Sequence, residues 1–240
     1  MSIEPSTPAL SRNARVAFGI TALLSALGLT LNVIITALGV YPSTTTNPNL
    51  FGYSDPSGLT GVISRVLDFA SYFTILSNVV VVVVLAALWR GRIGPTPVWR
   101  TLRMDSLVMI TVTGLVFAVV LAPTADLQGL QYVTNTLEHY VTPLLTVLTF
   151  LVWGPRGWLR LGTVFTALVI PIIWLAYTLL RGAVIDSYPY SFLNVAEFGL
   201  GRVLLNVAGV VLLGVVLGLV FWGLDRLLSR RSAHSDVSTS

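Results

Sequence analysis

Long apolar stretches separated by short polar ones dominate the sequence. A helix needs about 20 residues to cross the roughly 30 Å hydrocarbon core of a bilayer, and six stretches approach or exceed this length. They cover residues 16–40, 69–88, 104–121, 133–152, 162–180 and 203–224. The pattern predicts an all-α, polytopic membrane bundle with six transmembrane helices, contained within residues 15–228.

The arginines predict the orientation of this bundle, because basic residues next to spans favour the cytoplasmic side. With a cytoplasmic N-terminus, the residues that lie inside are Arg12, Arg15, Arg90, Arg92, Arg100, Arg103, Arg156, Arg160, Arg226, Arg230 and Arg231. Arg65, Arg181 and Arg202 then lie outside. Both termini are therefore expected in the cytoplasm. Asp105, next to Arg103, is expected at the cytoplasmic interface, which leaves the inner half of the bundle without buried polar groups.

The two ends of the chain differ from the spans. Residues 1–14 and 229–240 are polar and rich in Ser and Thr, and we expect a disordered cytoplasmic head and tail. The first apolar stretch follows Arg12 and Arg15, as in a secretory signal. Because it runs for about 25 residues, longer than a signal core, we expect it to be retained as an anchor.

Composition narrows the chemistry. Hydrophobic residues make up 55% of the chain and charged residues 10%, so a water-soluble globule could not cover its own surface. The absence of cysteine excludes disulfides, thiolate catalysis and cysteine-ligated metal centres. His234 lies in the polar tail, and neither a metal site nor a cofactor is expected. The net charge of +4 does not indicate nucleic acid, because the arginines alternate with apolar stretches instead of forming one stripe.

Polar side chains inside the second and fourth spans gather at one depth. These residues are Ser71, Thr74, Ser77, Asn78, Asn135, Glu138, His139 and Thr142. At 1.5 Å per residue, Thr74 and His139 both lie roughly 7–9 Å below the outer boundary. Asn32 and Asn206 reach the same level from the first and sixth spans. We therefore predict a small hydrated pocket that opens to the outer leaflet.

The residue types at this level fit acyl transfer. A threonine hydroxyl becomes a nucleophile when a base takes its proton, and histidine is the usual base near neutral pH. Thr74 and His139 are the catalytic candidates, and the amide of Asn78 or Asn32 is a candidate oxyanion donor. The remaining asparagines, Asn135 and Asn206, are candidates for supporting or orienting roles. Structural roles stay open, since such threonines often bond their own backbone and asparagines often link helices.

Two neighbours of His139 affect what it can do. Pro143 lacks the N–H that would bond the carbonyl of His139, so this carbonyl needs another partner. Glu138 points about 100° away from His139 on a helix and is not expected to orient the imidazole.

Three motifs occur in order along spans two to six: FASYFTILSN at 69–78, LEHYVTP at 137–143 and YPYSFLN at 188–194. In these motifs the chain resembles the androgen-induced and FAR-like six-helix integral membrane proteins, particularly their bacterial branch of unassigned function. The animal members are threonine hydrolases that cleave fatty acid esters of hydroxy fatty acids. The resemblance implies a multi-pass protein of the bacterial plasma membrane with Thr74 as nucleophile and His139 as base.

We therefore expect an intramembrane lipid ester hydrolase whose pocket opens to the outer leaflet. Tyr188, Tyr190 and Phe192 of the outer aromatic segment are expected to hold the acyl chain. The expected partners are membrane lipids, including a fatty acyl ester substrate. The alternative is a non-catalytic lipid-binding protein or a small-molecule carrier, and a carrier would show polar groups through both leaflets.

Overall fold

The computed structural model describes residues 10–54 and 56–237, with side chains up to Arg230, and this part of the chain is helical without extended strands. The α-helices are α1 Arg12–Ala37, α2 Gly58–Ser71, α3 Phe73–Trp89, α4 Pro97–Val116, α5 Gln131–Thr136, α6 Thr142–Trp153, α7 Leu161–Thr166, α8 Val169–Ile185 and α9 Val195–Val237. Two π-helical turns, η1 Phe117–Leu121 and η3 Leu137–Val141, extend α4 and join α5 to α6. The short 3₁₀ turns are η2 Ala122–Thr124 and η4 Ser191–Leu193. The all-α prediction is confirmed.

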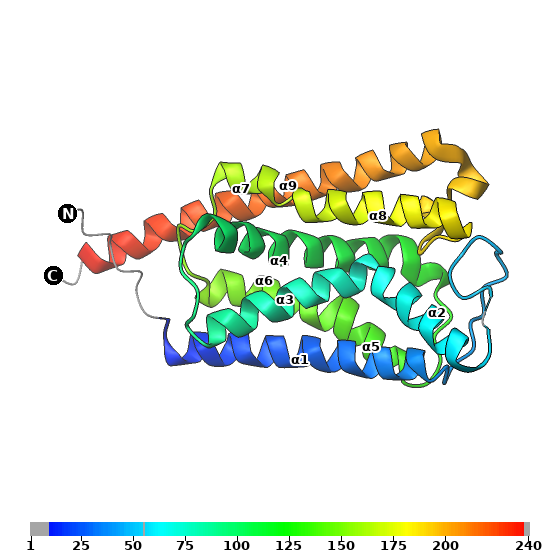
Figure 1. The fold of residues 1–240 in the computed structure, drawn as a ribbon. Coiled ribbons are helices and arrows are strands. Elements are labelled where there is room, and N and C mark those ends of the chain that lie inside the picture. Colours follow the sequence, from blue (N-terminus) through cyan, green and yellow to red (C-terminus); the bar gives the residue numbers. More distant parts are fainter. Residues whose placement is uncertain (1–9, 55, 238–240) are drawn as a thin grey trace.

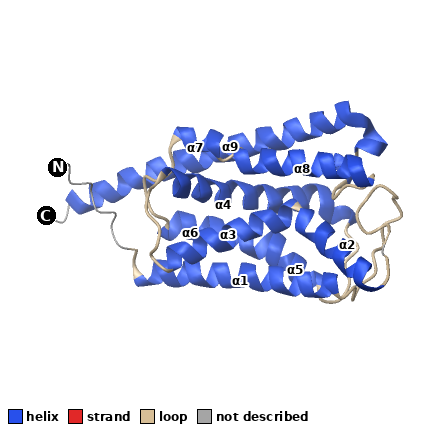
Figure 2. Cartoon of the chain, viewed as in Figure 1, coloured by secondary structure: helices blue, strands red, loops and turns tan. Residues whose placement is uncertain are grey.

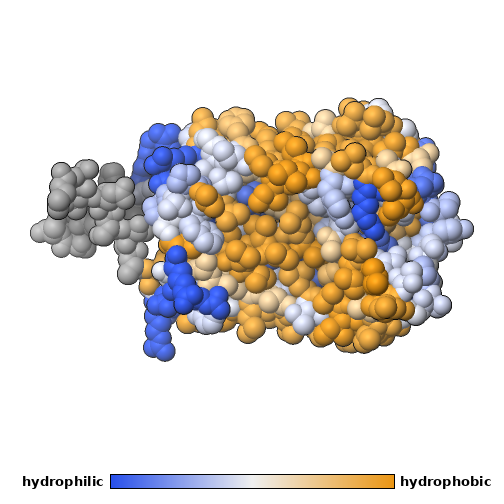
Figure 3. All heavy atoms as spheres, in the orientation of Figure 1, coloured by the Kyte–Doolittle hydropathy of each residue, from blue (hydrophilic) through white to orange (hydrophobic). Residues whose placement is uncertain are grey.

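Several helices are suited to a membrane. Four segments are long and apolar enough to cross it, namely Arg12–Ala37, Pro97–Thr124, Leu161–Ile185 and Val195–Arg230. The pair α2 and α3, bent by 68°, makes a fifth if it counts as one span. The segment 131–153 is helical throughout, but polar residues interrupt its apolar sequence, and it is not among these candidate spans. On the face shown in Figure 3, apolar residues cover the middle of the bundle and hydrophilic residues lie toward both ends.

The helices lie roughly along one axis (Figures 1 and 2). α1 packs against α3 and α6, and α4 lies centrally against α3, α6 and α9. The start of α1, the C-terminal part of α9 and the loops 90–96 and 154–160 share one end, here called the basic end. The loops 38–54, 122–130 and 186–190 form the opposite end, here called the loop end.

The second predicted span differs from the structure because the helix breaks between α2 and α3. Residues 58–68, expected within or next to an outer loop, form most of α2. Neighbouring donors replace the bonds lost at the break: the Trp174 indole N–H donates to the carbonyl of Ser71 at 2.9 Å. The Ser71 and Tyr177 hydroxyls are also bonded at 2.9 Å. Thus α8 stabilises a break that the apolar pattern conceals.

The half of the bundle near the basic end contains buried charged residues, contrary to the expectation for Asp105. α4 begins at Pro97, so Arg103 and Asp105 lie inside the helix with exposures of 1% and 0%. The Arg103 guanidinium carbon lies 5.8 Å from the Phe18 ring centroid and 5.7 Å from that of Phe150. Within the described part of the chain, neither the guanidinium of Arg103 nor the carboxylate of Asp105 has a hydrogen-bond partner.

The chain ends are more helical than the expected head and tail. α1 starts at Arg12, where the Ser11 hydroxyl accepts a hydrogen bond from the amide of Ala14. α9 continues to Val237 and so includes most of the expected tail, after a kink at Gly199 with φ +73°. The expected disorder at residues 1–9 and 238–240, and the side chain of His234, lie outside the described residues.

Candidate active site

Thr74 and His139 contact each other near the loop end. Thr74 is the second residue of α3 and is 7% exposed, while His139 lies in η3, between α5 and α6. The Thr74 Oγ1 is 3.1 Å from the His139 Nε2, although the residues are 65 positions apart. The structure thus brings the two catalytic candidates within hydrogen-bonding distance.

A main-chain contact determines the direction of this hydrogen bond. The His139 Nδ1 lies 3.2 Å from the carbonyl oxygen of Asn135. A carbonyl only accepts, so Nδ1 carries the proton and Nε2 of the neutral ring is an acceptor. The Thr74 hydroxyl therefore donates to Nε2, which is the arrangement that base activation requires. Asn135 orients the imidazole through its main chain.

A wide helical turn presents the imidazole. Because Pro143 has no N–H, the usual bond to the carbonyl of His139 is missing, and η3 instead closes with a bond from the amide of Thr142 to the carbonyl of Leu137. Such π-turns interrupt α-helices frequently at functional sites. This turn explains how the proline affects the local geometry of His139.

α4 closes around the other side of the histidine. A Cβ added to Gly114 would lie 3.1 Å from the His139 carbonyl oxygen, so a side chain there would crowd this carbonyl and glycine allows the close approach of α4. In η1, the Phe117 ring covers the imidazole, with centroids 4.1 Å apart and planes inclined by 31°. The imidazole is therefore held by neighbours on α4 and on its own helix.

The start of α3 supplies hydrogen-bond donors beside Thr74. The first amides of a helix have no intrahelical acceptor, and Tyr72 gives no side-chain cap here. The Tyr190 hydroxyl lies against the amides of Phe73 and Thr74 and against the Thr74 side chain. Amide donors and the helix dipole at this point favour a developing negative charge.

The side-chain amide of Asn78, a predicted oxyanion donor, already makes hydrogen bonds within the protein. Its amide donates to the carbonyls of Thr74 at 2.9 Å and Glu138 at 3.3 Å, which uses both of its N–H groups. Its oxygen accepts from the Ser25 hydroxyl at 3.0 Å. Asn78 thus ties α3 to α1 and to η3, and the structure assigns it to positioning rather than to the substrate.

Asn32, the other amide candidate, bonds a carboxylate. Its Nδ2 donates to Glu138 Oε2 at 2.8 Å, and its oxygen accepts from Thr36 at 3.4 Å. The second Glu138 oxygen has no partner among the described residues, although Glu138 is 1% exposed. Glu138 therefore faces Asn32 instead of orienting the imidazole, as its helical position predicted.

The outer aromatic segment divides into two groups. Asn206 donates to the carbonyl of Phe192 at 2.9 Å, and Tyr188 packs its ring against Gly182. These contacts hold the segment in place away from the reacting atoms. The Tyr190 and Phe192 rings stack with centroids 5.3 Å apart. Tyr190 lines both of the cavities described next, and Phe192 lines the apolar one.

A polar cavity of about 600 Å³ lies above the Thr74–His139 pair at the loop end. Its wall includes Asn32, Glu138, Asp68 and exposed residues of the loops 41–54 and 124–127. A wall of this composition can hold water and a polar group. The site is therefore accessible from the loop end.

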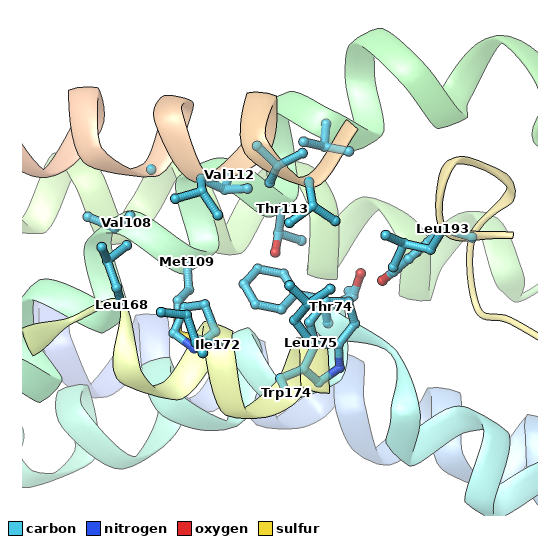
Figure 4. Close-up of a pocket in the computed structure, with 18 of the residues that line it drawn as sticks. Thr74, Val108, Met109, Val112, Thr113, Leu168, Ile172, Trp174, Leu175 and Leu193 are labelled. Atoms are coloured by element: carbon cyan, nitrogen blue, oxygen red, sulfur yellow. The ribbon is translucent and has the colours of Figure 1, made fainter. Parts of the chain in front are cut away.

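An apolar cavity of about 110 Å³, here called the slot, begins at the same pair and extends toward the basic end. It lies between α4, α8 and α9, and Figure 4 shows the side chains of Val112, Ile172 and Leu175 around it. Thr74, Leu121, His139 and Tyr190 line both cavities. Thr74 and His139 thus lie at the boundary between the polar cavity and the slot.

Several features of this site have no clear sequence signal. The α3 amides become available only because the helix breaks, and no Pro or Gly occurs in residues 69–78. The stacking of Phe117 on His139 depends on a second π-turn that its apolar surroundings do not reveal. Pro143 was the one visible indication of irregular helix geometry.

Comparison with known proteins gives no match to this chain among family models, curated proteins or solved structures.

Proposed function

We propose that this protein is an intramembrane hydrolase of fatty acyl esters. The observation that carries the proposal is the 3.1 Å contact from Thr74 Oγ1 to an acceptor nitrogen of His139. Its position between a polar cavity and an apolar slot suits a lipid with a polar part and an acyl chain.

Acylation would use the groups around Thr74. The His139 Nε2 takes the hydroxyl proton as Thr74 Oγ1 bonds to the acyl carbon. The α3 amides and the Tyr190 hydroxyl donate to the carbonyl oxygen as it becomes negative. When the ester C–O bond breaks, the imidazolium returns the proton to the leaving alcohol, and the acyl group remains on Thr74.

Deacylation would repeat these steps with water from the polar cavity. His139 removes a proton from water while the water oxygen bonds to the acyl carbon. The C–O bond to Thr74 then breaks, and the imidazolium gives its proton back to Thr74 Oγ1. The fatty acid is released and both side chains return to their starting state.

The proposed setting is a six-span protein of the bacterial plasma membrane with both termini in the cytoplasm. The arginine distribution supports it, because the basic end carries Arg12, Arg90, Arg100 and Arg156 with their neighbours. In this orientation the polar cavity faces the outer side. The segment 131–153, the fourth along the chain, would complete the six spans, with its polar residues turned toward the site.

The resemblance to androgen-induced and FAR-like proteins supports the same reaction. Its three motifs contain Thr74, His139 and Tyr190, which meet at one site although they lie on separate segments. Membership of that family is part of the proposal.

A non-catalytic carrier of lipids or small molecules is the second candidate. The buried Arg103 and Asp105 favour it, because they supply polar groups in the half of the bundle near the basic end. Neither of the two cavities described above includes Arg103 or Asp105 in its wall. The hydrolase is therefore the better-supported proposal.

An activity probe tests the hydrolase directly. Purified protein in detergent is treated with a fluorescent phosphonate that modifies serine and threonine hydrolases. We expect wild type and Thr74→Ser to be labelled, no labelling of Thr74→Ala, and a rate lower by about 10²- to 10⁴-fold in His139→Ala.

Thr111→Ala is the matched control, since Thr111 bonds its own backbone at the carbonyl of Leu107. It should be labelled like wild type. Labelling of Thr74→Ala at the wild-type rate would exclude Thr74 as the nucleophile. A wild-type protein that reacts with no phosphonate and cleaves no acyl ester would support the carrier.

A further inference from the structure

The walls of the slot are suited to hydrocarbon. Apart from Thr74, His139 and the Tyr190 hydroxyl at the entrance, the polar groups of its lining are already engaged: the Thr113 hydroxyl bonds Ser77 at 2.9 Å, and the Trp174 indole donates to Ser71. The remaining wall consists mainly of valine, leucine, isoleucine and aromatic side chains. An apolar chain can enter without leaving a polar group unpaired, whereas a polar chain would find no partners.

The helix register gives the depth of the slot. The bond from Ser77 to Thr113 places these residues at one level, and α3 and α4 run in opposite directions. Thr74 is three positions above this level and Val108 five positions below it. At 1.5 Å per residue, the separation along the axis is about 12 Å.

The deep end of the slot is closed by close helix packing. A Cβ added to Gly218 of α9 would lie 2.9 Å from Val164 Cγ1 of α7, so these helices pack closely at Val164, which is part of the slot wall. One turn nearer the site, a Cβ on Gly214 would meet Val108 Cγ1 at 3.8 Å. Gly218 thus allows the close packing that ends the slot, and Gly214 leaves open the deep part of the slot next to Val108.

We infer that the slot measures the acyl chain and selects an acyl group of about eight to ten carbons, because a C–C bond of about 1.5 Å at a tetrahedral angle advances about 1.25 Å per carbon along a depth of about 12 Å. The carbonyl carbon lies at Thr74 and the terminal methyl group reaches Val108 and Gly214. This inference rests on the proposed hydrolase function and specifies its substrate class.

A series of p-nitrophenyl esters with acyl chains of 4 to 16 carbons tests chain selection. Wild-type protein should cleave esters of eight to ten carbons fastest and those of 14 or more slowly. Gly214→Leu fills the deep part of the slot, so the ratio of ten-carbon to four-carbon rates should fall by about tenfold or more.

Gly209→Leu is the matched control on the same helix, because a Cβ at Gly209 meets nothing within 4 Å. It should keep the wild-type chain-length profile. If Gly214→Leu also keeps that profile while cleaving esters, the slot does not measure the chain, and the hydrolase proposal still holds.

A fatty-acid binding experiment tests chain selection independently of ester cleavage. Brominated fatty acids of 6 to 16 carbons should quench the fluorescence of Trp174, identified by comparison with Trp174→Phe, most strongly at eight to ten carbons. Gly214→Leu should lose this quenching even if no ester is cleaved. Equal quenching at every chain length would overturn the inference.

Discussion

The imidazole of His139 is contacted on both nitrogens and on its face by different parts of the chain. The Asn135 carbonyl binds Nδ1, the Thr74 hydroxyl binds Nε2, and the Phe117 ring covers the plane. Asn78 fixes the carbonyl of Thr74 from below. At the residue scale, the geometry of the pair is therefore set by neighbours that need not touch a substrate.

Tyr190→Phe tests the proposed oxyanion site. The change keeps the ring that lines both cavities and removes the hydroxyl beside the α3 amides. Loss of one such donor typically lowers kcat by about 10²- to 10³-fold, and we expect a decrease of this order in ester hydrolysis with little change in stability.

Tyr188→Phe provides the control, since Tyr188 is absent from the walls of both cavities. Its rate should remain within about twofold of wild type. Equal rates for Tyr190→Phe and wild type would mean that the α3 amides act without the tyrosine.

Some of the contacts at the site could be predicted from the sequence, and others could not. Thr74 and His139 could be paired because both spans enter from one side and a fixed rise per residue gives depth. The roles of Asn78 and Asn32 could not be predicted, because each also has a partner on another segment of the chain. Tyr188 and Tyr190 look equivalent in sequence, yet only Tyr190 lines the cavities.

The break between α2 and α3 is the main feature at the scale of elements. It places the first turn of α3 next to the histidine, and α8 stabilises it through Trp174 and Tyr177. A second link, from Arg181 to Asp68 at 2.6 Å, joins α8 to α2. α8 thus helps to position Thr74, the proposed nucleophile, although it contributes neither catalytic candidate.

The apolar stretches predicted where most of the helices lie but not where these helices break or widen. Residues 69–88 read as one span because a break needs no Pro or Gly when side chains of another helix supply the missing donors. The buried position of Asp105 was missed for a related reason. α4 starts at Pro97, earlier than its apolar stretch begins, and this draws charged residues into the bundle.

Gly182→Ala tests how α8 positions the outer aromatic segment. A Cβ at this position would lie 2.1 Å from Cε1 of the Tyr188 ring, so the ring and the neighbouring Tyr190 must shift. Overpacking of this kind typically costs about 1–3 kcal/mol. We expect a lower unfolding temperature in detergent and slower ester hydrolysis.

Gly162→Ala is the comparison, because a Cβ at Gly162 meets nothing within 4 Å. Its unfolding temperature should not fall. If both variants unfold at the wild-type temperature, the Tyr188 ring accommodates the added methyl group without cost, and the close packing at Gly182 does not position the outer aromatic segment.

The whole molecule combines a belt for the bilayer with two compartments that meet inside it. The polar cavity lies at the loop end, and the slot extends toward the basic end. Because arginines are concentrated at the basic end, we expect the polar cavity to face away from the cytoplasm. The proposed enzyme would then act on lipids of the outer leaflet.

The absence of native cysteine allows a direct test of this orientation. Ser54→Cys places a thiol at the loop end, in the wall of the polar cavity, and Gly94→Cys places one at the basic end, where a Cβ meets nothing within 4 Å. A membrane-impermeant maleimide applied to intact cells should label Ser54→Cys alone.

Permeabilised cells provide the control, because both variants should then react. Labelling of Gly94→Cys in intact cells, without labelling of Ser54→Cys, would reverse the proposed orientation. Labelling of both would show that the two ends face the same side.

The interruption before Phe73 has an evolutionary consequence. The donors that it exposes belong to the peptide backbone, so no replacement of the Phe73 or Thr74 side chain except by proline can delete them. Under the proposed function, descendants of this chain could exchange the residues that line the slot, and thereby their preferred lipids, while inheriting the same backbone donors for the proposed reaction. A proline at Phe73 or Thr74, or a change that straightens the chain at this point, would abolish it.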